Sequence, residues 1–288
     1  MNLQHILTEI EKVDPEVYDR LDSRRGAMQR FAFAGKVLAA AAVPFALGGM
    51  FNKAYGRSTA TILEVLNYAL TLEYLEAEFY TRVVATTGVI PAGPALGALT
   101  TIRDHENAHV NFLKTAITAS GGTPVAKPTF DFSGGSFAGG PGTGNGPFKD
   151  AFTNYDLMLA VAQTFEDTGV RAYKGAAGDL ISNNDVLTAA LQIHSVEARH
   201  ASHIRQMRKA RGGALVVGDV KPWITLNQSG IASTAVQATY NGEEVTKQAT
   251  IELVNINGKT ISAAAASEAF DEPLTMAQVL AIVDGFIV

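Results

Sequence analysis

The stretches HENAHVNFL (residues 105–113) and HSVEARHASHI (residues 194–204) decide the fold, because each contains one Glu-x-x-His motif. A lone Glu precedes each motif at a similar distance and is itself followed, seven residues later, by Tyr80 or Tyr173. This repeat predicts one helical hairpin used twice, and six ligands of this kind suit two metal ions inside a four-helix bundle. The candidate metal ligands are Glu73, Glu106, His109, Glu166, Glu197 and His200.

Helical periodicity places each candidate ligand near the middle of an apolar stripe. The stripes run from Leu66 to Val84, from Leu99 to Ala116, from Leu159 to Ala177 and from Val186 to Met207. No Arg or Lys falls on them, so two divalent metal ions would have to offset the cost of burying the carboxylates, which is several kcal/mol each. The alternatives are that these side chains lie on solvated faces or form buried ion pairs in a metal-free bundle.

Three further stretches, LNYALTLEYLEAEFY (66–80), AQTFEDTGVRAYKGAA (162–177) and FDEPLTMAQVLAIVDGFI (270–287), complete a resemblance. The chain resembles the ferritin-like superfamily, and more narrowly the bacterial and plant ferritin-like domain proteins that include the desiccation-related proteins. The resemblance implies an all-α fold, a left-handed four-helix bundle with a long crossover between its second and third helices, and a centre of two Fe or two Mn ions. It also implies ligand roles: Glu106 and Glu197 bridge the metals, His109 and His200 bind one each, and Glu73 and Glu166 are terminal.

Other polar residues near the ligands have alternative roles. Glu76 lies about 60° around the helix from Glu73 and could replace it, although the following Tyr80 favours Glu73. Tyr80 and Tyr173 are candidate catalytic residues that could hydrogen-bond the terminal carboxylates or carry a radical, whereas an aromatic residue at helical spacing is more often part of the core. The remaining histidines nearby, His105, His194 and His203, are expected to point away from the metals. The alternative for His194 and His203 is contact with a metal ligand or a place at a metal entry site.

The sequence divides into three predicted parts: an N-terminal extension at residues 1–57, the four-helix bundle at 58–211 and a C-terminal appendage at 212–288. Arg24 and Arg25 precede the weakly hydrophobic residues 31–51, which resembles a twin-arginine export signal and predicts a periplasmic or cell-envelope protein. The alternative is a cytoplasmic protein that retains its N-terminus, with residues 31–51 packing on the protein or contacting a membrane surface.

Two connections carry structural predictions. Residues 119–147 are rich in Gly and Pro, which predicts the crossover. Residues 236–262 alternate, with Asn-Gly turn signals at 241–242 and 257–258, which predicts a small β-ribbon. A short helix is expected from about Thr275 to Asp284.

Composition narrows the function. A net charge of −5 gives no reason to expect nucleic acid as a partner. The chain contains no Cys, which excludes iron–sulfur clusters and thiolate zinc sites.

The prediction is a dinuclear iron or manganese protein whose partner is a small oxidant, dioxygen or hydrogen peroxide, acting as a ferroxidase, peroxidase or catalase-like protein. The alternatives are a structural desiccation- or stress-related protein with little catalysis, and iron storage, which would need a hollow homo-oligomer.

Overall fold

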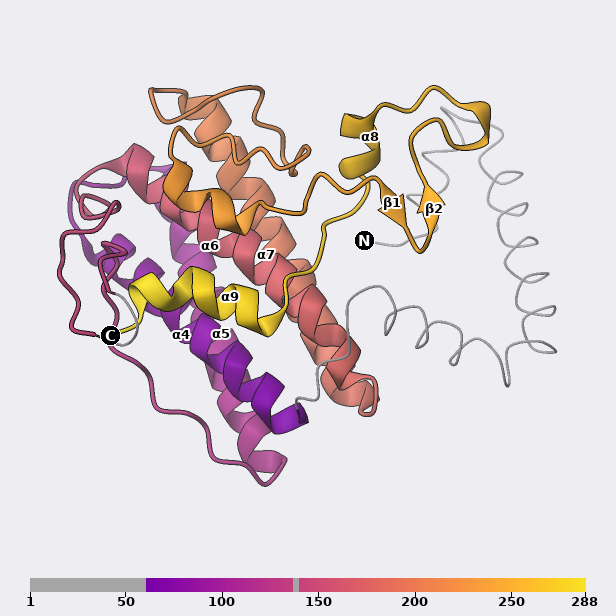
Figure 1. Cartoon of the computed structure of the whole chain (residues 1–288). Helices are drawn as coiled ribbons and strands as arrows, with labels where there is room; N and C mark the ends of the chain where they lie inside the picture. The colour runs from indigo at the N-terminus through magenta and orange to yellow at the C-terminus, as the bar shows by residue number, and fades with distance from the viewer. Residues whose placement is uncertain (1–60, 137–139) are drawn as a thin grey trace, which may run out of the picture. The chain divides into compact units, whose positions relative to one another are not determined.

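The computed structural model describes residues 61–136 and 140–288, and four long helices dominate this part of the chain (Figure 1). The helices are α4 (Ile62–Ala85), α5 (Pro94–Ala119), α6 (Tyr155–Ala176) and α7 (Asn184–Arg211). They contain the four apolar stripes except for Ala177, which directly follows α6, and their buried positions form one continuous hydrophobic core. The predicted all-α fold with a four-helix bundle is confirmed.

Local sequence signals fix where the helices begin. Thr61 caps α4 in a capping box, in which its hydroxyl accepts from the Glu64 amide while the Glu64 carboxylate accepts from the Thr61 amide. The side chains of Asn154 and Asn183 cap α6 and α7 in a similar way, each accepting from two backbone amides. Pro94 begins α5, where its missing amide costs no hydrogen bond.

The helices pack as two hairpins, α4 with α5 and α6 with α7. The first residues of α4 and α7 and the last residues of α5 and α6 meet at one end of the bundle (Figure 1). Because α5 and α6 therefore run in the same direction, their connection must return along the whole bundle. The Gly- and Pro-rich segment does so, which confirms the predicted crossover.

The crossover is held in place by the C-terminus of the chain. Phe130 forms an antiparallel bridge with Ile287, the Asp131 amide donates to the Phe286 carbonyl at 2.9 Å, and the Ser136 amide donates to the Gly285 carbonyl at 2.9 Å. Aromatic rings fill the space beneath, with Phe132 against Phe79 and Phe148 stacked on Phe286. These contacts bury the middle of the crossover although it has little regular structure.

The C-terminal appendage consists of short elements. They are η2 (Thr234–Thr239), β1 (Lys247–Gln248), β2 (Ile251–Glu252), η3 (Ile256–Gly258), α8 (Ala263–Ser267), α9 (Met276–Val283) and η4 (Asp284–Phe286), and η1 (Ala177–Leu180) follows α6. The predicted terminal helix is confirmed as α9, which Thr275 caps.

The predicted β-ribbon exists, but it is much shorter than residues 236–262. Its turn is at Ala249 and Thr250, both at positive φ, and not at either Asn-Gly pair. Gly242 instead lies against the buried Arg171, and Gly258 ends η3. Both Asn-Gly pairs lie in turns, with the Glu243 amide donating to the Tyr240 carbonyl at 3.3 Å and the Gly258 amide to the Asn255 carbonyl at 3.1 Å, but neither turn joins the two strands.

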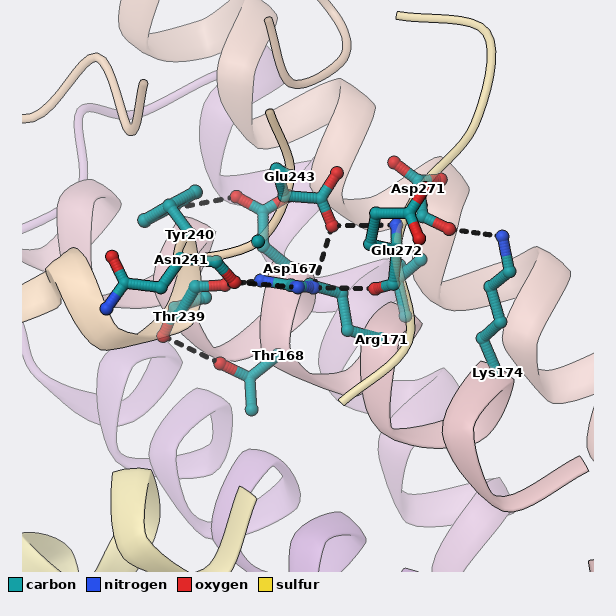
Figure 2. A network of polar contacts seen from close by, with 12 residues as sticks. Asp167, Thr168, Arg171, Lys174, Thr239, Tyr240, Asn241, Glu243, Asp271 and Glu272 are labelled. Atoms are coloured by element: carbon teal, nitrogen blue, oxygen red, sulfur yellow. Dashed lines mark hydrogen bonds and ion pairs between the residues drawn. The ribbon is translucent and has the colours of Figure 1, made fainter. Parts of the chain in front are cut away.

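A buried guanidinium fastens the appendage to α6 (Figure 2). Arg171 donates to the backbone carbonyls of Thr239, Asn241 and Glu272, and its Nε lies 2.7 Å from Oε1 of Glu243. The Glu243 carboxylate in turn accepts from the Glu272 amide at 2.9 Å. One side chain thus satisfies backbone carbonyls from two separate segments, which would be costly to bury unpaired.

In the part of the chain that the structure describes, no helix is long and apolar enough to cross a membrane. The predicted export signal and the predicted membrane contact of residues 31–51 lie outside the described residues.

Candidate metal centre

The structure brings all six predicted ligands together from four different helices. Glu73 comes from α4, Glu106 and His109 from α5, Glu166 from α6, and Glu197 and His200 from α7. The four carboxylates are fully buried, His200 is 5% exposed, and His109 is half-buried. Each helix therefore delivers its ligands to the interior, as the apolar stripes predict.

One group of donor atoms surrounds Nδ1 of His109. Oxygen atoms of three carboxylates lie close to this nitrogen: Oε2 of Glu73 at 3.2 Å, Oε2 of Glu106 at 3.1 Å and Oε1 of Glu197 at 3.1 Å. The four residues each offer one atom within 4.8 Å of the others. This spacing suits ligands arranged around a single cation.

The second group surrounds Nδ1 of His200 in the same manner. Its neighbours are Oε1 of Glu106 at 2.9 Å, Oε2 of Glu166 at 3.2 Å and Oε2 of Glu197 at 3.4 Å. Glu106 and Glu197 belong to both groups, and each directs one oxygen to His109 and the other to His200. The two groups are therefore adjacent and share two carboxylates.

Several of these closely spaced atoms make no hydrogen bond. Among the described residues, no hydrogen-bond partner exists for Oε1 of Glu106, Oε2 of Glu166, both carboxylate oxygens of Glu197, or Nδ1 of His200. These carboxylate oxygens and imidazole nitrogens are close enough for hydrogen bonds, but their angles are unsuitable. Buried polar atoms are rarely left unpaired, and atoms that point to a common centre are suited to share a cation.

Tyr80 and Tyr173 hold the terminal carboxylates from across the bundle. The Tyr80 hydroxyl donates to Oε1 of Glu166 at 2.5 Å, and the Tyr173 hydroxyl donates to Oε1 of Glu73 at 2.5 Å. In each carboxylate the other oxygen, Oε2, faces a donor group. The predicted hydrogen bond between each tyrosine and a terminal carboxylate is thus present.

Glu76 is buried beside the centre but outside both donor groups. A Cβ at Gly169 would lie 3.2 Å from Oε1 of Glu76 and 3.6 Å from Cγ of Glu197, so the missing side chain of Gly169 leaves room for Glu76. Burial, followed by the charge of Glu197, raises the pKa of Glu76 well above its usual value. Of the two candidates in α4, Glu73 is the one that joins the donor groups.

His105 corrects one sequence prediction. Although it was expected to point away from the site because it neighbours Glu106, its Nδ1 lies 3.0 Å from Nε2 of His200. The side chain is long enough to reach across to α7 at the surface, where His105 is exposed. The other two histidines are placed as predicted, because the ring of His194 bonds to the Val170 carbonyl at 3.0 Å and His203 is exposed.

Three buried arginines lie in the same bundle, but their partners are not the candidate metal ligands. Arg205 pairs with Asp167 at 2.5 Å, Arg208 binds Gln163, and Arg171 belongs to the network in Figure 2. The apolar stripes do not predict these contacts, because the three arginines lie off all four stripes. The signal that could have revealed them is the i, i+4 spacing of Asp167 and Arg171, two opposite charges on one side of a helix.

Comparison with known proteins gives a match to one family model. The model is described as the ferritin-like domain and matches residues 61–210, more than half of the chain. A search of curated proteins finds no match.

Proposed function

Because the chain belongs to the ferritin-like domain family, we propose that its buried carboxylate and histidine groups hold two iron or manganese ions that react with dioxygen or hydrogen peroxide. The observation that carries this proposal is the shared position of Glu106 and Glu197. Each places one oxygen in each donor group, which is the arrangement required of a carboxylate that bridges two cations.

The charge of the site supports two divalent cations. The donor groups contain four buried carboxylates, and two divalent ions would neutralise them. The alternative is that His109 and His200 are protonated and form buried ion pairs, but two imidazolium groups would balance only half of this charge. The metal-free arrangement also leaves Nδ1 of His200 without a properly directed hydrogen bond. Isolated buried charge is costly, so the metal-bound form is favoured.

The chemistry supplied by such ions is electron exchange with a small oxidant, whose two oxygens a two-metal site can hold together. Carboxylate and imidazole ligands suit both Fe(II) and Mn(II). The protein's own residues orient and protect this centre. Tyr80 and Tyr173 fix the terminal carboxylates, and Glu76 is buried beside Glu197, where burial raises the pKa of Glu76 well above its usual value.

The absence of Cys favours reactions that need no separate electron-transfer module. In one reaction, two Fe(II) ions and two protons reduce one hydrogen peroxide to two water molecules. In the other, manganese would catalyse conversion of two hydrogen peroxide molecules into dioxygen and two water molecules. Both take their electrons from the metal or from peroxide itself.

The test combines metal analysis with rapid mixing. After anaerobic loading, the protein should bind about two Fe or Mn ions per chain, whereas Glu106→Ala and Glu197→Ala should bind almost none, because each removes a shared carboxylate. The Fe(II)-loaded protein is then mixed with dioxygen or peroxide, and oxygen evolution is measured for the Mn-loaded protein. Exposed His203→Ala is the matched control and should behave as the wild type.

Three outcomes would contradict the proposal. A metal content near zero would reject the centre itself. Two bound metals with no turnover above that of Glu106→Ala would reject the enzyme and favour a structural, desiccation- or stress-related protein. Mineral accumulation in a hollow oligomer would indicate iron storage instead.

A further inference from the structure

His105 lies outside both donor groups but contacts one of their imidazoles. Its Nδ1 is 3.0 Å from Nε2 of His200, and the two ring planes differ by only 15°. The ring centroids are 5.2 Å apart. Because each nitrogen lies about 1.1 Å from its own ring centre, this separation places both nitrogens on the line between the rings, the direction that a hydrogen bond requires.

The two nitrogens of the His200 ring therefore face different partners. Nδ1 faces carboxylate oxygens of Glu106, Glu166 and Glu197 at 2.9–3.4 Å, whereas Nε2 faces His105. A neutral imidazole has one N–H group and one lone pair. A metal ion in this donor group needs the lone pair on Nδ1, so the proton belongs on Nε2, where Nδ1 of His105 can accept it.

Without such an acceptor, the opposite tautomer would gain an advantage. The three negative carboxylates attract a proton to Nδ1 of His200, which is the nitrogen that must stay unprotonated to bind metal. An acceptor at Nε2 opposes this attraction and also fixes the rotation of the ring. His105 can act in this way because it is exposed, so water can bond to its other nitrogen.

This contact has no counterpart in the second hairpin. His105 directly precedes the first Glu-x-x-His motif, and the residue that directly precedes the second motif is Val196. A valine side chain cannot accept a hydrogen bond. The contact with His105 therefore distinguishes the His200 group from the His109 group, although their ligands are of the same kind.

We propose that His105 is a positioning residue, which accepts the Nε2 proton of His200 and so keeps the Nδ1 lone pair directed into the donor group. This inference rests on the proposed metal centre. It makes metal binding at the His200 group depend on an exposed side chain of α5, and it leaves the His109 group independent of that side chain.

Two substitutions separate the acceptor from the ring. His105→Phe keeps an aromatic ring but removes the acceptor, whereas His105→Asn removes the ring and can place its Oδ1 where Nδ1 was. Competition with a chelator on the full-length chain measures the two metal dissociation constants. His105→Phe should weaken one of them by about 10- to 100-fold and leave the other unchanged, and His105→Asn should restore wild-type values. Exposed His203→Phe is the matched control and should bind as the wild type does.

Two further backgrounds identify the affected group. Glu73→Gln removes a ligand from the His109 group only, and Glu166→Gln removes one from the His200 group only. Adding His105→Phe should weaken binding of the remaining ion in the Glu73→Gln chain and have no effect in the Glu166→Gln chain.

A second measurement needs no metal. In the metal-free chain labelled with ¹⁵N-histidine, the Nε2 proton of His200 should give an NMR signal protected from exchange with water, which His200→Gln identifies by its loss. His105→Asn should keep this signal, and His105→Phe should abolish it.

The role of His105 is overturned if two metals bind and His105→Phe equals the wild type, if His105→Asn weakens binding as much as His105→Phe does, or if the wild type shows no protected Nε2 proton. A wild type that binds no metal would instead reject the proposed function and, with it, any effect of His105 on affinity. Metal content of the wild type thus distinguishes the two failures.

Discussion

At the residue scale, the two tyrosines connect the halves of the centre in a crossed arrangement. Glu73 and Tyr80 share a helix, yet Tyr80 donates to Glu166 of α6, and Tyr173 of α6 donates to Glu73 of α4. Each hydroxyl leaves one carboxylate oxygen to face a donor group. Hydrogen bonds of this kind orient metal ligands and commonly change metal affinity by about 10- to 100-fold when they are removed.

We expect Tyr173→Phe to weaken metal binding at the His109 group, and Tyr80→Phe to weaken it at the His200 group, by about 10- to 100-fold each. Competition with a metal chelator measures both affinities. In a Glu73→Gln background, Tyr173→Phe should add nothing, whereas Tyr80→Phe should keep its effect. Tyr74→Phe is the control, because the Tyr74 hydroxyl reaches only the Val125 carbonyl, at 3.5 Å. Equal effects of all three substitutions would reject an orienting role.

The two buried carboxylates of α4 should respond differently to neutralisation. Glu73→Gln removes a ligand from one donor group only, so metal content should fall from about two ions to about one per chain. Glu76→Gln should keep about two ions, because Glu76 lies outside both groups. Half-exposed Glu78, which pairs with Lys127 at 2.8 Å, provides the control Glu78→Gln. Elemental analysis of the loaded proteins measures the metal content. Loss of metal from Glu76→Gln alone would show that Glu76, and not Glu73, is the metal ligand in α4.

At the element scale, α6 separates two kinds of buried charge. Every residue from Met158 to Tyr173 is buried, because the bundle covers one side of the helix and the C-terminal appendage covers another. Glu166 joins the donor groups, while the next residue, Asp167, turns by about 100° and meets Arg205 and Tyr240. The arginines are thereby occupied away from the candidate metal centre and do not neutralise its carboxylates.

Close packing of the appendage on α6 requires Gly175. A Cβ at this position would lie 1.9 Å from the Leu274 carbonyl oxygen, a backbone atom that cannot rotate away. Gly175→Ala should therefore displace the segment before α9 and lower the free energy of unfolding by about 1–3 kcal/mol in urea denaturation.

Gly178→Ala is the matched control, since no atom lies within 4 Å of its added Cβ, and it should be neutral or slightly stabilising. If Gly175→Ala is as stable as this control, the close contact with Leu274 does not constrain the fold.

At the scale of the whole molecule, export stays a prediction from the sequence. If Arg24 and Arg25 belong to a twin-arginine signal, replacing both with Lys should trap the protein in the cytoplasm, where cell fractionation would detect it. Replacing Arg20 and Arg30 with Lys is the matched control. Unchanged fractionation of the Arg24 and Arg25 variant would favour a retained N-terminus.

The sequence by itself determined the helices, their apolar faces and the six residues of the centre. These features are local, because a helix repeats every 3.6 residues and an apolar stripe therefore reports which side chains turn inward. Glu73, Glu106 and His109 could be found in this way, as could their counterparts in the second hairpin. The sequence also predicts the crossover, from its Gly- and Pro-rich composition, and the Thr275 cap of α9.

Only the tertiary structure decided which groups meet across the bundle. The crossed tyrosine bonds, the contact of His105 with His200 and the buried Arg171 network all join residues far apart in the chain. Helical periodicity gives the direction of a side chain around its own axis, but not the distance or rotation of the neighbouring helix. The two Asn-Gly pairs do lie in turns, but the ribbon strands pair around Ala249 and Thr250 instead, because which segments pair is decided by contacts beyond the turn itself.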